Sequence, residues 1–434
     1  MNTQSAPTFS YKKIAAIGSG FFALTMIWTF YNAYMPLILG DFIESRAIRG
    51  VIMGLDNLLA VLLIPLIGSW SDRLQSPLGN RLPFIIIGMP IAAIFFILIP
   101  YSATVTLWLL LLIDVIFLLA MTVYRAPVIA LMPDHTHPSK RSTANGVINL
   151  MGGIGAIMAL FLLSNLFIIN RAFPFIVAGI FLMLSFILLY YIVDRKPPYS
   201  SNSNDSLEET QASLSFSHSL LKLKEKQYRG HLFILIAIFL YFIGYSGMEA
   251  QFTVYAVEYL QLDENVAGMT LGFFSLSFVL FAIPAGILGS KLGKAPTMFI
   301  GLIALPLLFI LIPLLPLFVS VTSNHSFVII LQAVLFLSGI AWAFINVQAY
   351  PLVADLGGVH RIGFFTGLYY LFSMASSIIA PGLLGLFMDF IGHSSLFYCA
   401  AITFIIAFYF LKKGHTIISS HHHHQQLTST DVQG

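Results

Sequence analysis

The chain has 434 residues, of which 58% are hydrophobic and only 9% are charged, and its formal net charge is +3. Soluble domains carry about 25% charged residues, so this composition excludes a protein whose surface faces water over most of its area. Lipid cannot satisfy the backbone of open strands, and the apolar runs here are continuous rather than alternating. We therefore expect an all-α membrane protein in a lipid bilayer, with no nucleic-acid partner. The single cysteine, Cys399, excludes an internal disulfide.

Twelve apolar runs reach the roughly 20 residues that a membrane-spanning helix requires. The expected spans are 14–40, 48–70, 83–101, 105–131, 142–169, 173–193, 231–257, 266–290, 295–320, 326–352, 362–388 and 394–411. Of the 21 lysines and arginines, 17 fall on one side of these spans, Arg46, Arg49 and Arg171 fall on the other, and Arg125 lies within a span. Because basic residues accumulate on the cytoplasmic side, we expect a multi-pass protein of the cell membrane with both termini in the cytoplasm.

The spans divide into two six-helix halves, 1–193 and 231–412. Between them, residues 194–230 are rich in Ser and Asn and poor in apolar residues, which is typical of a cytoplasmic linker. Residues 413–434 are expected to form a polar cytoplasmic tail, and we interpret His421–His424 as part of that tail rather than as a metal site. No metal and no other cofactor is expected.

A loop motif recurs in the two halves. The segment GSWSDRLQSPLGNR (68–81) follows the second span, and GILGSKLGK (286–294) follows the eighth. Gly68 and Gly286 open the two copies, and we call the difference between their residue numbers the repeat offset.

A second spacing supports the repeat. The 12-residue separation of Asp134 and Gly146 after the fourth span recurs between Asp355 and Gly367 after the tenth. Internal repeats of this kind are typical of transporters, which bind substrate near the midplane between the halves.

These loops are expected to form a cytoplasmic gate, in which charges pair across the halves when the inner side is closed and the helix dipole favours an anion at a helix start. The alternative is that they are solvated charges that only set the orientation. The gate candidates are Gly68, Asp72, Arg73, Arg81, Asp134, Arg141, Lys291, Asp355 and Arg361.

The first of these loops resembles the signature of the major facilitator superfamily, G-x3-D-R-x-G-R-R, with matches at Gly68, Asp72, Arg73, Gly79 and Arg81. In the second copy a serine, Ser290, replaces the aspartate, so a weaker contact is expected there. The resemblance implies the major facilitator fold, with 12 transmembrane helices in two six-helix halves, and a transporter rather than an enzyme.

Ionisable residues within the spans are few, and two of them lie in the fourth. Asp114 and Arg125 are 11 residues apart, which places them on one face of a helix but about 16 Å apart along it. They are too distant to pair, so each must face a polar cavity or a partner on another helix. Burial disfavours the charged form of a carboxylate, so Asp114 can load and unload a proton. Alternatively, Asp114 bonds a neighbouring helix and Arg125 extends to the inner face.

The segment IDVIFLLAMTVYRAPVIALMPD (113–134) resembles the fourth span of sucrose–proton symporters of plants and related animal solute carriers, which are glycoside–cation symporters. SDRLQSPLGNRLPF (71–84) is similar to their loop S-D-R-x-x-S-x-x-G-R-R-x-P-F. The resemblance implies proton-coupled import of a sugar or glycoside, such as sucrose or maltose, with Asp114 as the proton carrier and Arg125 in the coupled site. Related sodium symporters carry D-x3-D-P in the second span, where this chain has Ala60 and Ile64 before Pro65. This difference favours protons over sodium.

The seventh span places Tyr241, Tyr245 and Glu249 on one face at a spacing of four residues. We expect Glu249 to be a second acid that binds protons or substrate, or else a partly exposed acid near the outer end. Gly244 and Gly247 are expected to break this helix, as in transporters with discontinuous helices.

Other polar side chains within the spans are candidates for binding the hydroxyls of a sugar, although intramembrane amides also join helices to one another. These substrate-binding candidates are Asn32, Asp56, Asn149, Tyr245, Asn346 and Gln348. The solute partner is thus a small molecule, and one chain is expected to act as a monomer. The alternatives are a proton-coupled exporter of drugs or other solutes and, from another class, a non-transporting membrane sensor.

Overall fold

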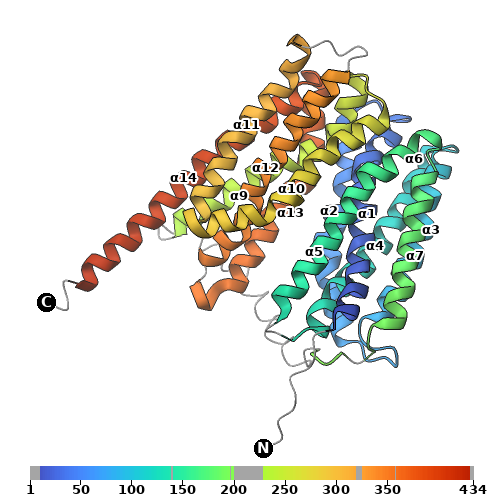
Figure 1. Cartoon of the computed structure of the whole chain (residues 1–434), viewed down its shortest axis with the longest axis horizontal. Coiled ribbons are helices and arrows are strands. Elements are labelled where there is room, and N and C mark those ends of the chain that lie inside the picture. The colour runs from blue at the N-terminus through green and yellow to red at the C-terminus, as the bar shows by residue number, and fades with distance from the viewer. Residues whose placement is uncertain are drawn as a thin grey trace, which may run out of the picture. The chain divides into compact units, whose positions relative to one another are not determined.

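The computed structural model describes residues 10–137, 140–195, 197–199, 228–318, 325–356 and 358–430, with the side chains of residues 142, 358–363 and 421–430 left out. Within these ranges all regular structure is helical (Figure 1). The elements of the first half are α1 (Tyr11–Gly40), α2 (Arg46–Arg73), α3 (Leu82–Ser102), α4 (Leu107–His135), α5 (Arg141–Met158), the π-helical turn η2 (Ala159–Leu163), α6 (Ser164–Ile169) and α7 (Phe173–Ile192). Those of the second half are α9 (Arg229–Val254), the π-helical turn η4 (Tyr255–Tyr259), α10 (Glu264–Leu292), α11 (Lys294–Phe318), α12 (His325–Leu356), α13 (Gly358–Phe390) and α14 (Ser395–Thr430).

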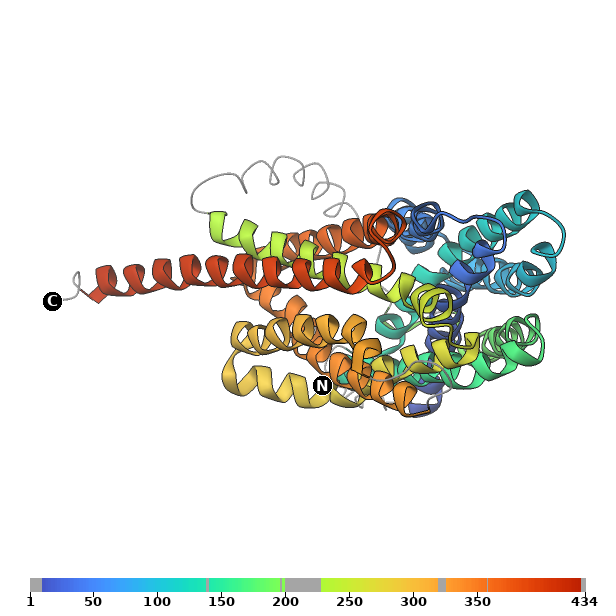
Figure 2. The ribbon, with the colours of Figure 1, turned by 90° about the horizontal axis from the view of Figure 1, so that it is seen from above.

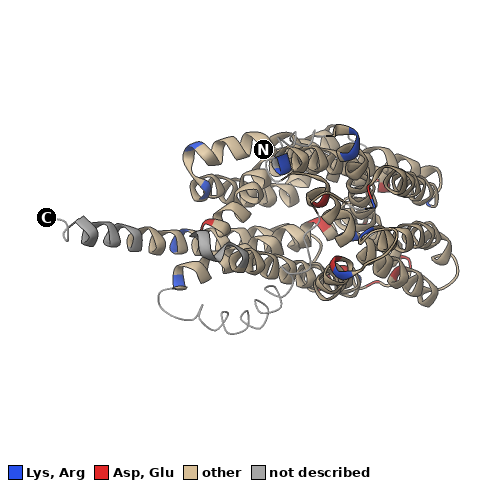
Figure 3. Ribbon diagram, turned by 90° about the horizontal axis from the view of Figure 1, so that it is seen from below, with Lys and Arg blue, Asp and Glu red and all other residues tan. Residues whose placement is uncertain are grey.

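Twelve helices of the described chain are long and apolar enough to cross a membrane, which confirms the predicted spans. The fifth span consists of α5, η2 and α6, and the seventh of α9 and η4. Charged residues are sparse along the helices (Figure 3), as expected for a surface that faces lipid. The predicted linker, 194–230, falls mostly outside the described residues.

Local sequence fixes where several helices begin. The hydroxyl of Thr106 accepts a hydrogen bond from the backbone N–H of Leu109 (3.2 Å) at the start of α4, and Ser10 does the same for Lys13 (3.4 Å) at the start of α1. Both are N-caps, which satisfy backbone donors that have no partner within the helix. A proline lies in the first turn of α3 and of α7, where its fixed backbone angle suits a helix start.

Helix neighbours recur between the halves as the repeat predicts. In the first half α1 packs against α5 and α7, and α3 against α4 and α7. In the second half α9 packs against α13 and α14, and α11 against α12 and α14, which are the corresponding spans. The loop motifs separated by the repeat offset therefore belong to two similarly packed bundles.

Two compact units describe the packing, and they depart from the predicted halves at two helices. The first unit contains residues 1–42, 58–208 and 262–272, and the second contains 43–57, 209–261 and 273–434. The first turns of α2 thus pack within the second unit, and the first turns of α10 pack within the first. Elsewhere each predicted half falls within one unit.

The expectation of a break in the seventh span is wrong. The backbone of α9 is continuous through Gly244 and Gly247, because these glycines serve close packing: a Cβ on Gly244 would lie 2.5 Å from the hydroxyl oxygen of Thr403 in α14. Helix α14 continues through the first part of the predicted tail to Thr430 and extends past its neighbours (Figures 1 and 2). Its continuation packs on the start of α9, where a Cβ on Gly230 would lie 2.7 Å from a side-chain carbon of Ile418.

Candidate functional site

Asp114 is buried in α4, with 1% of its surface exposed, and it faces α1. The phenol of Tyr31 donates a hydrogen bond of 3.3 Å to its Oδ2 atom. The ring of Tyr31 also packs against Phe117, one turn along α4, at a centroid distance of 5.5 Å. The carboxyl group is therefore buried, and it accepts a hydrogen bond from a phenol whose ring packs on α4.

Arg125, three turns further along α4, is half-buried and also faces α1. Its guanidinium carbon lies 5.3 Å from the ring centroid of Trp28, within the range of a cation–π interaction. Trp28 in turn stacks on Tyr31, with centroids 6.0 Å apart and planes inclined by 26°. Two neighbouring aromatic residues of α1 thus connect the two ionisable groups of α4, and these four residues form what we call the α1–α4 site.

The helical period of α4 placed Asp114 and Arg125 on one face, and both indeed contact the same neighbouring helix. Sequence reasoning missed Trp28, because a local pattern does not show which residue of another helix faces a given charge. The spacing of Trp28 and Tyr31, i and i+3, was the available signal, since such residues share a helix face.

In the second unit, Glu249 of α9 accepts a hydrogen bond of 2.9 Å from the phenol of Tyr245. The Tyr245 ring stacks on Trp342 of α12, with centroids 4.0 Å apart and planes inclined by only 7°. Phe274 of α10 lies 5.9 Å from the same ring. Glu249 therefore lies at an aromatic cluster on three helices, and its role in proton or substrate binding stays a prediction.

The other substrate-binding candidates lie in different surroundings. Asp56 is buried in α2 and accepts hydrogen bonds from the backbone and the side chain of Asn57, the latter at 2.7 Å. Gln348 is buried and donates to the carbonyl of Ala285 at 2.8 Å, joining α12 to α10, which supports the alternative role of an amide that joins helices. Asn32 and Asn346 are half-buried, and Asn149 is exposed.

The loop between α2 and α3 is organised by Arg81, whose side chain is 11% exposed. Its Nε atom donates to Asp134 at the end of α4 (2.9 Å), and a second nitrogen pairs with Asp72 at the end of α2. Gly79 lies in the same loop with a φ of +86°, and a Cβ there would overlap the backbone carbonyl of Arg195, so both the turn and this close approach favour glycine. The motif residues thus bind one another within the first unit, and pairing across the halves stays a prediction.

The remaining gate candidates lie in different surroundings. In the second unit Asp355 pairs with Lys294, again within its own half. Arg141 donates to the carbonyl of Pro133 (3.4 Å), while Arg73 and Lys291 are exposed. The side chain of Arg361 lies outside the described residues, and Gly68 has no heavy atom within 4 Å of the position that a Cβ would occupy.

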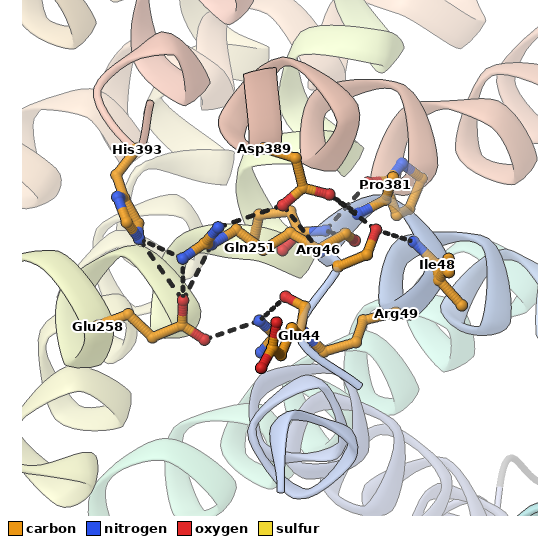
Figure 4. Close-up of polar contacts among 11 residues, drawn as sticks. Glu44, Arg46, Ile48, Arg49, Gln251, Glu258, Pro381, Asp389 and His393 are labelled. Atoms are coloured by element: carbon orange, nitrogen blue, oxygen red, sulfur yellow. Dashed lines mark hydrogen bonds and ion pairs between the residues drawn. The ribbon is translucent and has the colours of Figure 1, made fainter. Parts of the chain in front are cut away.

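A polar cluster that sequence reasoning missed surrounds Arg46, the first residue of α2 (Figure 4). The guanidinium of Arg46 pairs with Asp389 of α13 (3.2 Å) and with Glu258 of η4 (2.6 Å). Arg49, only 2% exposed, pairs with the other oxygen of Glu258 at 2.8 Å. His393 completes this Arg46 cluster, with its Nε2 atom 2.7 Å from the guanidinium of Arg46. In the sequence these arginines served only to assign the orientation.

His393 makes the Arg46 cluster sensitive to pH. Burial and the positive charges of Arg46 and Arg49 hold the pKa of His393 below its ordinary value of 6.5, although Glu258, 3.5 Å away, acts in the opposite direction. The Tyr259 ring stacks on the imidazole at 5.5 Å. Since the cluster favours the neutral imidazole, it is fully stabilised above about pH 6.5 and weakens as the pH falls below that value.

A smaller cluster lies in the first unit. Arg171, in the loop after α6, pairs with Asp41 at the end of α1 and with Glu264, the first residue of α10, both at 2.7 Å. We call these three residues the Arg171 triad. The side chain of Arg171 is 47% exposed, so water screens the triad more than the Arg46 cluster.

Comparisons with known proteins agree with this architecture. The family model described as Major Facilitator Superfamily matches residues 17–263 and 234–425. The solved structure of the nucleoside transporter NupG has a TM-score of 0.73 and 15% identity, covering 93% of this chain and 99% of that chain. A POT family transporter in complex with 5-aminolevulinic acid gives 0.70 and 14%, with 96% and 100% coverage.

A bacterial homologue of the iron transporter ferroportin, solved in an inward-facing state, gives a TM-score of 0.68 and 14% identity, with 94% and 100% coverage. At such low identity, likeness to these structures shows the fold alone. A comparison with curated protein sequences found no significant match. The substrate must therefore be argued from the residues of this chain.

Proposed function

Because the chain belongs to the major facilitator superfamily, we propose that it is a proton-coupled symporter of a sugar or glycoside, such as a disaccharide, working by alternating access. The family membership makes it a multi-pass membrane transporter and not an enzyme. The coupling ion and the solute class are the proposed parts, and they rest on residues of α1, α4 and α9.

The observation that carries the proposal is the convergence of Asp114 and Arg125 on the aromatic pair Trp28 and Tyr31. A carboxyl group at this depth in a span is costly, by about 2.5–3.5 kcal/mol on insertion scales, and such groups commonly mark ion pathways. Asp114 is well placed to carry a proton, because it is a buried acid within a span and the phenol of Tyr31 bonds its Oδ2 atom.

The contact with α1 gives a physical route for coupling. Protonation of Asp114 changes its hydrogen bond with Tyr31, and Tyr31 stacks on the tryptophan that holds the guanidinium of Arg125. A change at the acid can therefore alter the position of the arginine through two adjacent aromatic contacts. Arginine donors suit hydroxyl oxygens, and aromatic faces suit the apolar faces of sugar rings, so Trp28 and Arg125 fit a glycoside.

The second unit supplies a comparable pairing of an acid with aromatic rings. Glu249 is held by Tyr245, whose ring stacks on Trp342. Aromatic faces beside a polar side chain suit sugar rings with several hydroxyls, which supports a sugar over a single small ion. In this scheme Glu249 binds a hydroxyl of the solute or a second proton.

The test is solute-driven acidification of vesicles that contain the purified protein and an internal pH-sensitive dye. Disaccharides and monosaccharides are added without an imposed gradient, first without sodium and then with it. The proposal predicts acidification with one sugar, without any need for sodium, which is lost in Asp114→Asn. The matched control Asp263→Asn changes an exposed acid of the loop before α10 and should retain the signal.

A silent sugar panel, with protein shown to be folded, would contradict the proposed solute class. Proton-linked efflux of apolar cations from the same vesicles would instead establish the exporter alternative. Acidification that Asp114→Asn leaves intact would contradict the assigned proton carrier, whichever solute drives it.

A further inference from the structure

The repeat offset relates two ion pairs at the starts of α2 and α10. At this offset Glu264 corresponds to Arg46, and Asp389 corresponds to Arg171. Arg46 pairs with Asp389 at 3.2 Å, and Glu264 pairs with Arg171 at 2.7 Å. The same two positions of the repeat therefore form an ion pair in both copies, with the charges exchanged.

Both pairs extend in the same way to a second acid. Arg46 also binds Glu258, which follows α9 at the end of the seventh span. Arg171 also binds Asp41, which follows α1 at the end of the first span. In each unit one arginine thus bridges two acids from corresponding helix ends, but the arginine sits on the opposite member of the pair.

A tight helix crossing lies beside each ion pair. At the repeat offset, Gly50 and Gly54 of α2 correspond to Gly268 and Gly272 of α10. A Cβ on Gly50 would lie 2.1 Å from the carbonyl oxygen of Pro381 in α13, so the two backbones are in contact there. The counterparts Gly268 and Gly272 lie against side chains of α1 and the fifth span. The ion pairs therefore hold the same ends of α2 and α10 at which the glycines allow neighbouring helices to pack closely.

At these ends, α2 and α10 each pack within the unit that contains most of the other half of the chain. Residues 43–57 pack within the second unit while the rest of α2 packs within the first, and residues 262–272 of α10 show the converse. Each helix is thus attached to one unit by its first turns and to the other by its remainder. If the two units move during transport, the attachments of these first turns must change.

We propose that the Arg46 cluster and the Arg171 triad are repeat-related latches with exchanged charges, which hold the first turns of α2 and α10 and release them when the transporter opens on this side. The basic-residue bias assigns this side to the outside. The Arg46 cluster is the stronger latch, because its central arginine is 20% exposed against 47% for Arg171. The proposal rests on the family membership and not on the identity of the solute.

The exchanged charges provide the test. In Arg46→Glu the new carboxylate faces Asp389 and Glu258, so the latch should open. In the double variant Arg46→Glu/Asp389→Arg, one arginine again bridges two acids, in the arrangement that Arg171 already has with Glu264 and Asp41. The double variant should therefore close again, although it loses the hydrogen bonds that backbone N–H groups at the start of α2 donate to Asp389.

The readout is the distance between spin labels on the two units, measured by pulsed electron paramagnetic resonance in nanodiscs without solute. Labels are placed through Thr104→Cys, in the loop after α3, and Leu317→Cys, near the end of α11, both exposed. The background is Cys399→Ser, which removes the single native cysteine. The matched control is Lys412→Glu, which reverses the charge of an exposed lysine of α14.

Arg46→Glu should raise the ratio of long to short distances about tenfold, which corresponds to about 1.4 kcal/mol. The double variant should restore most of the wild-type distribution, and Lys412→Glu should leave the distribution unchanged. A wild-type distribution in Arg46→Glu, or a double variant as open as the single one, would overturn the proposal. If Arg46→Glu does not fold, the same contrast between Asp389→Arg and the double variant decides the question.

Because the spin-label experiment contains no solute, a result against the latch would not affect the proposed sugar substrate. A silent sugar panel would likewise not affect the latch proposal.

Discussion

Alanine substitutions at two glycines of α2 are expected to change stability in opposite directions. A Cβ on Gly50 would lie 2.1 Å from the carbonyl oxygen of Pro381 and 2.6 Å from the backbone nitrogen of Gly382, whereas a Cβ on Gly68 would have no heavy atom within 4 Å. Real Cβ contacts essentially never fall below 3.0 Å, so the crossing at Gly50 must widen by about 1 Å. Because the opposing atoms belong to the backbone, no side-chain rotation relieves the overlap.

The magnitude follows from two terms. Alanine favours the helix over glycine by about 1 kcal/mol at either position. Overpacking costs about 1–3 kcal/mol and applies only at Gly50. The helix term cancels between the variants, so Gly68→Ala should exceed Gly50→Ala in the free energy of unfolding by about 1–3 kcal/mol, and it should exceed the wild type by up to about 1 kcal/mol.

Unfolding of the purified protein in detergent, followed by the fluorescence of its four tryptophans, measures both variants. Stability is the appropriate readout because Gly68 belongs to the expected inner gate, where a substitution can also affect transport. A Gly50→Ala variant as stable as Gly68→Ala would refute the close crossing of α2 and α13.

Arg81→Ala should lower the free energy of unfolding by about 3 kcal/mol, since it leaves the buried carboxylate of Asp134 without this partner, whereas the exposed Arg73→Ala should change it by less than about 0.5 kcal/mol. Acidification from about pH 7.5 to about pH 5.5 should raise the long-distance population of the Thr104–Leu317 spin pair, because His393 gains a positive charge beside two arginines. Tyr31→Phe should slow proton-coupled uptake about tenfold, because Asp114 loses a hydrogen bond of a kind that contributes about 1.5–3 kcal/mol.

Each of these expectations has a result that would contradict it. Equal unfolding curves for the variants at Arg81 and Arg73 would show that the ion pairs of Arg81 contribute nothing to stability. The pH effect should disappear in His393→Gln, and its persistence there would assign it to another group. Unchanged uptake in Tyr31→Phe would show that the hydrogen bond from Tyr31 to Asp114 does not contribute to coupling. The control for that variant is Tyr101→Phe, at an exposed tyrosine.

The spans were predictable because a membrane-spanning helix needs a long apolar run, which the sequence shows directly. The shared face of Asp114 and Arg125, and that of Tyr245 and Glu249, follow from the helical period alone. In the structure the first pair contacts one neighbouring helix, and the phenol of Tyr245 bonds the carboxylate of Glu249.

Contacts between helices were not predictable in the same way. The sequence indicated that Asp134 carries a gate charge, but its partner Arg81 lies 53 residues away, and only the packing of α2, α3 and α4 brings them together. Gly244 illustrates the opposite error: its low helix propensity predicted a break, whereas the close approach of Thr403 makes a small residue necessary there. Propensity is a local quantity, and here tertiary packing overrides it.

The Arg46 cluster shows how much a repeat can add to a charge count. Arg46 and Arg171 are two isolated basic residues when each is taken alone, and they serve only the orientation. At the repeat offset, Arg46 corresponds to Glu264, and Arg171 corresponds to Asp389. Opposite charges at equivalent positions of the repeat were therefore present in the sequence, but the ion pairs that these residues form depend on how the helices pack.

Asp114→Asn provides the most direct test of proton coupling. Asparagine keeps the size of the side chain and an acceptor for Tyr31, but it cannot carry a proton. Uphill accumulation and solute exchange are measured in the same vesicles, with the sugar that the acidification panel identifies. The account predicts that Asp114→Asn loses accumulation driven by a proton gradient and retains exchange, whereas accumulation at the wild-type level in this variant would contradict it.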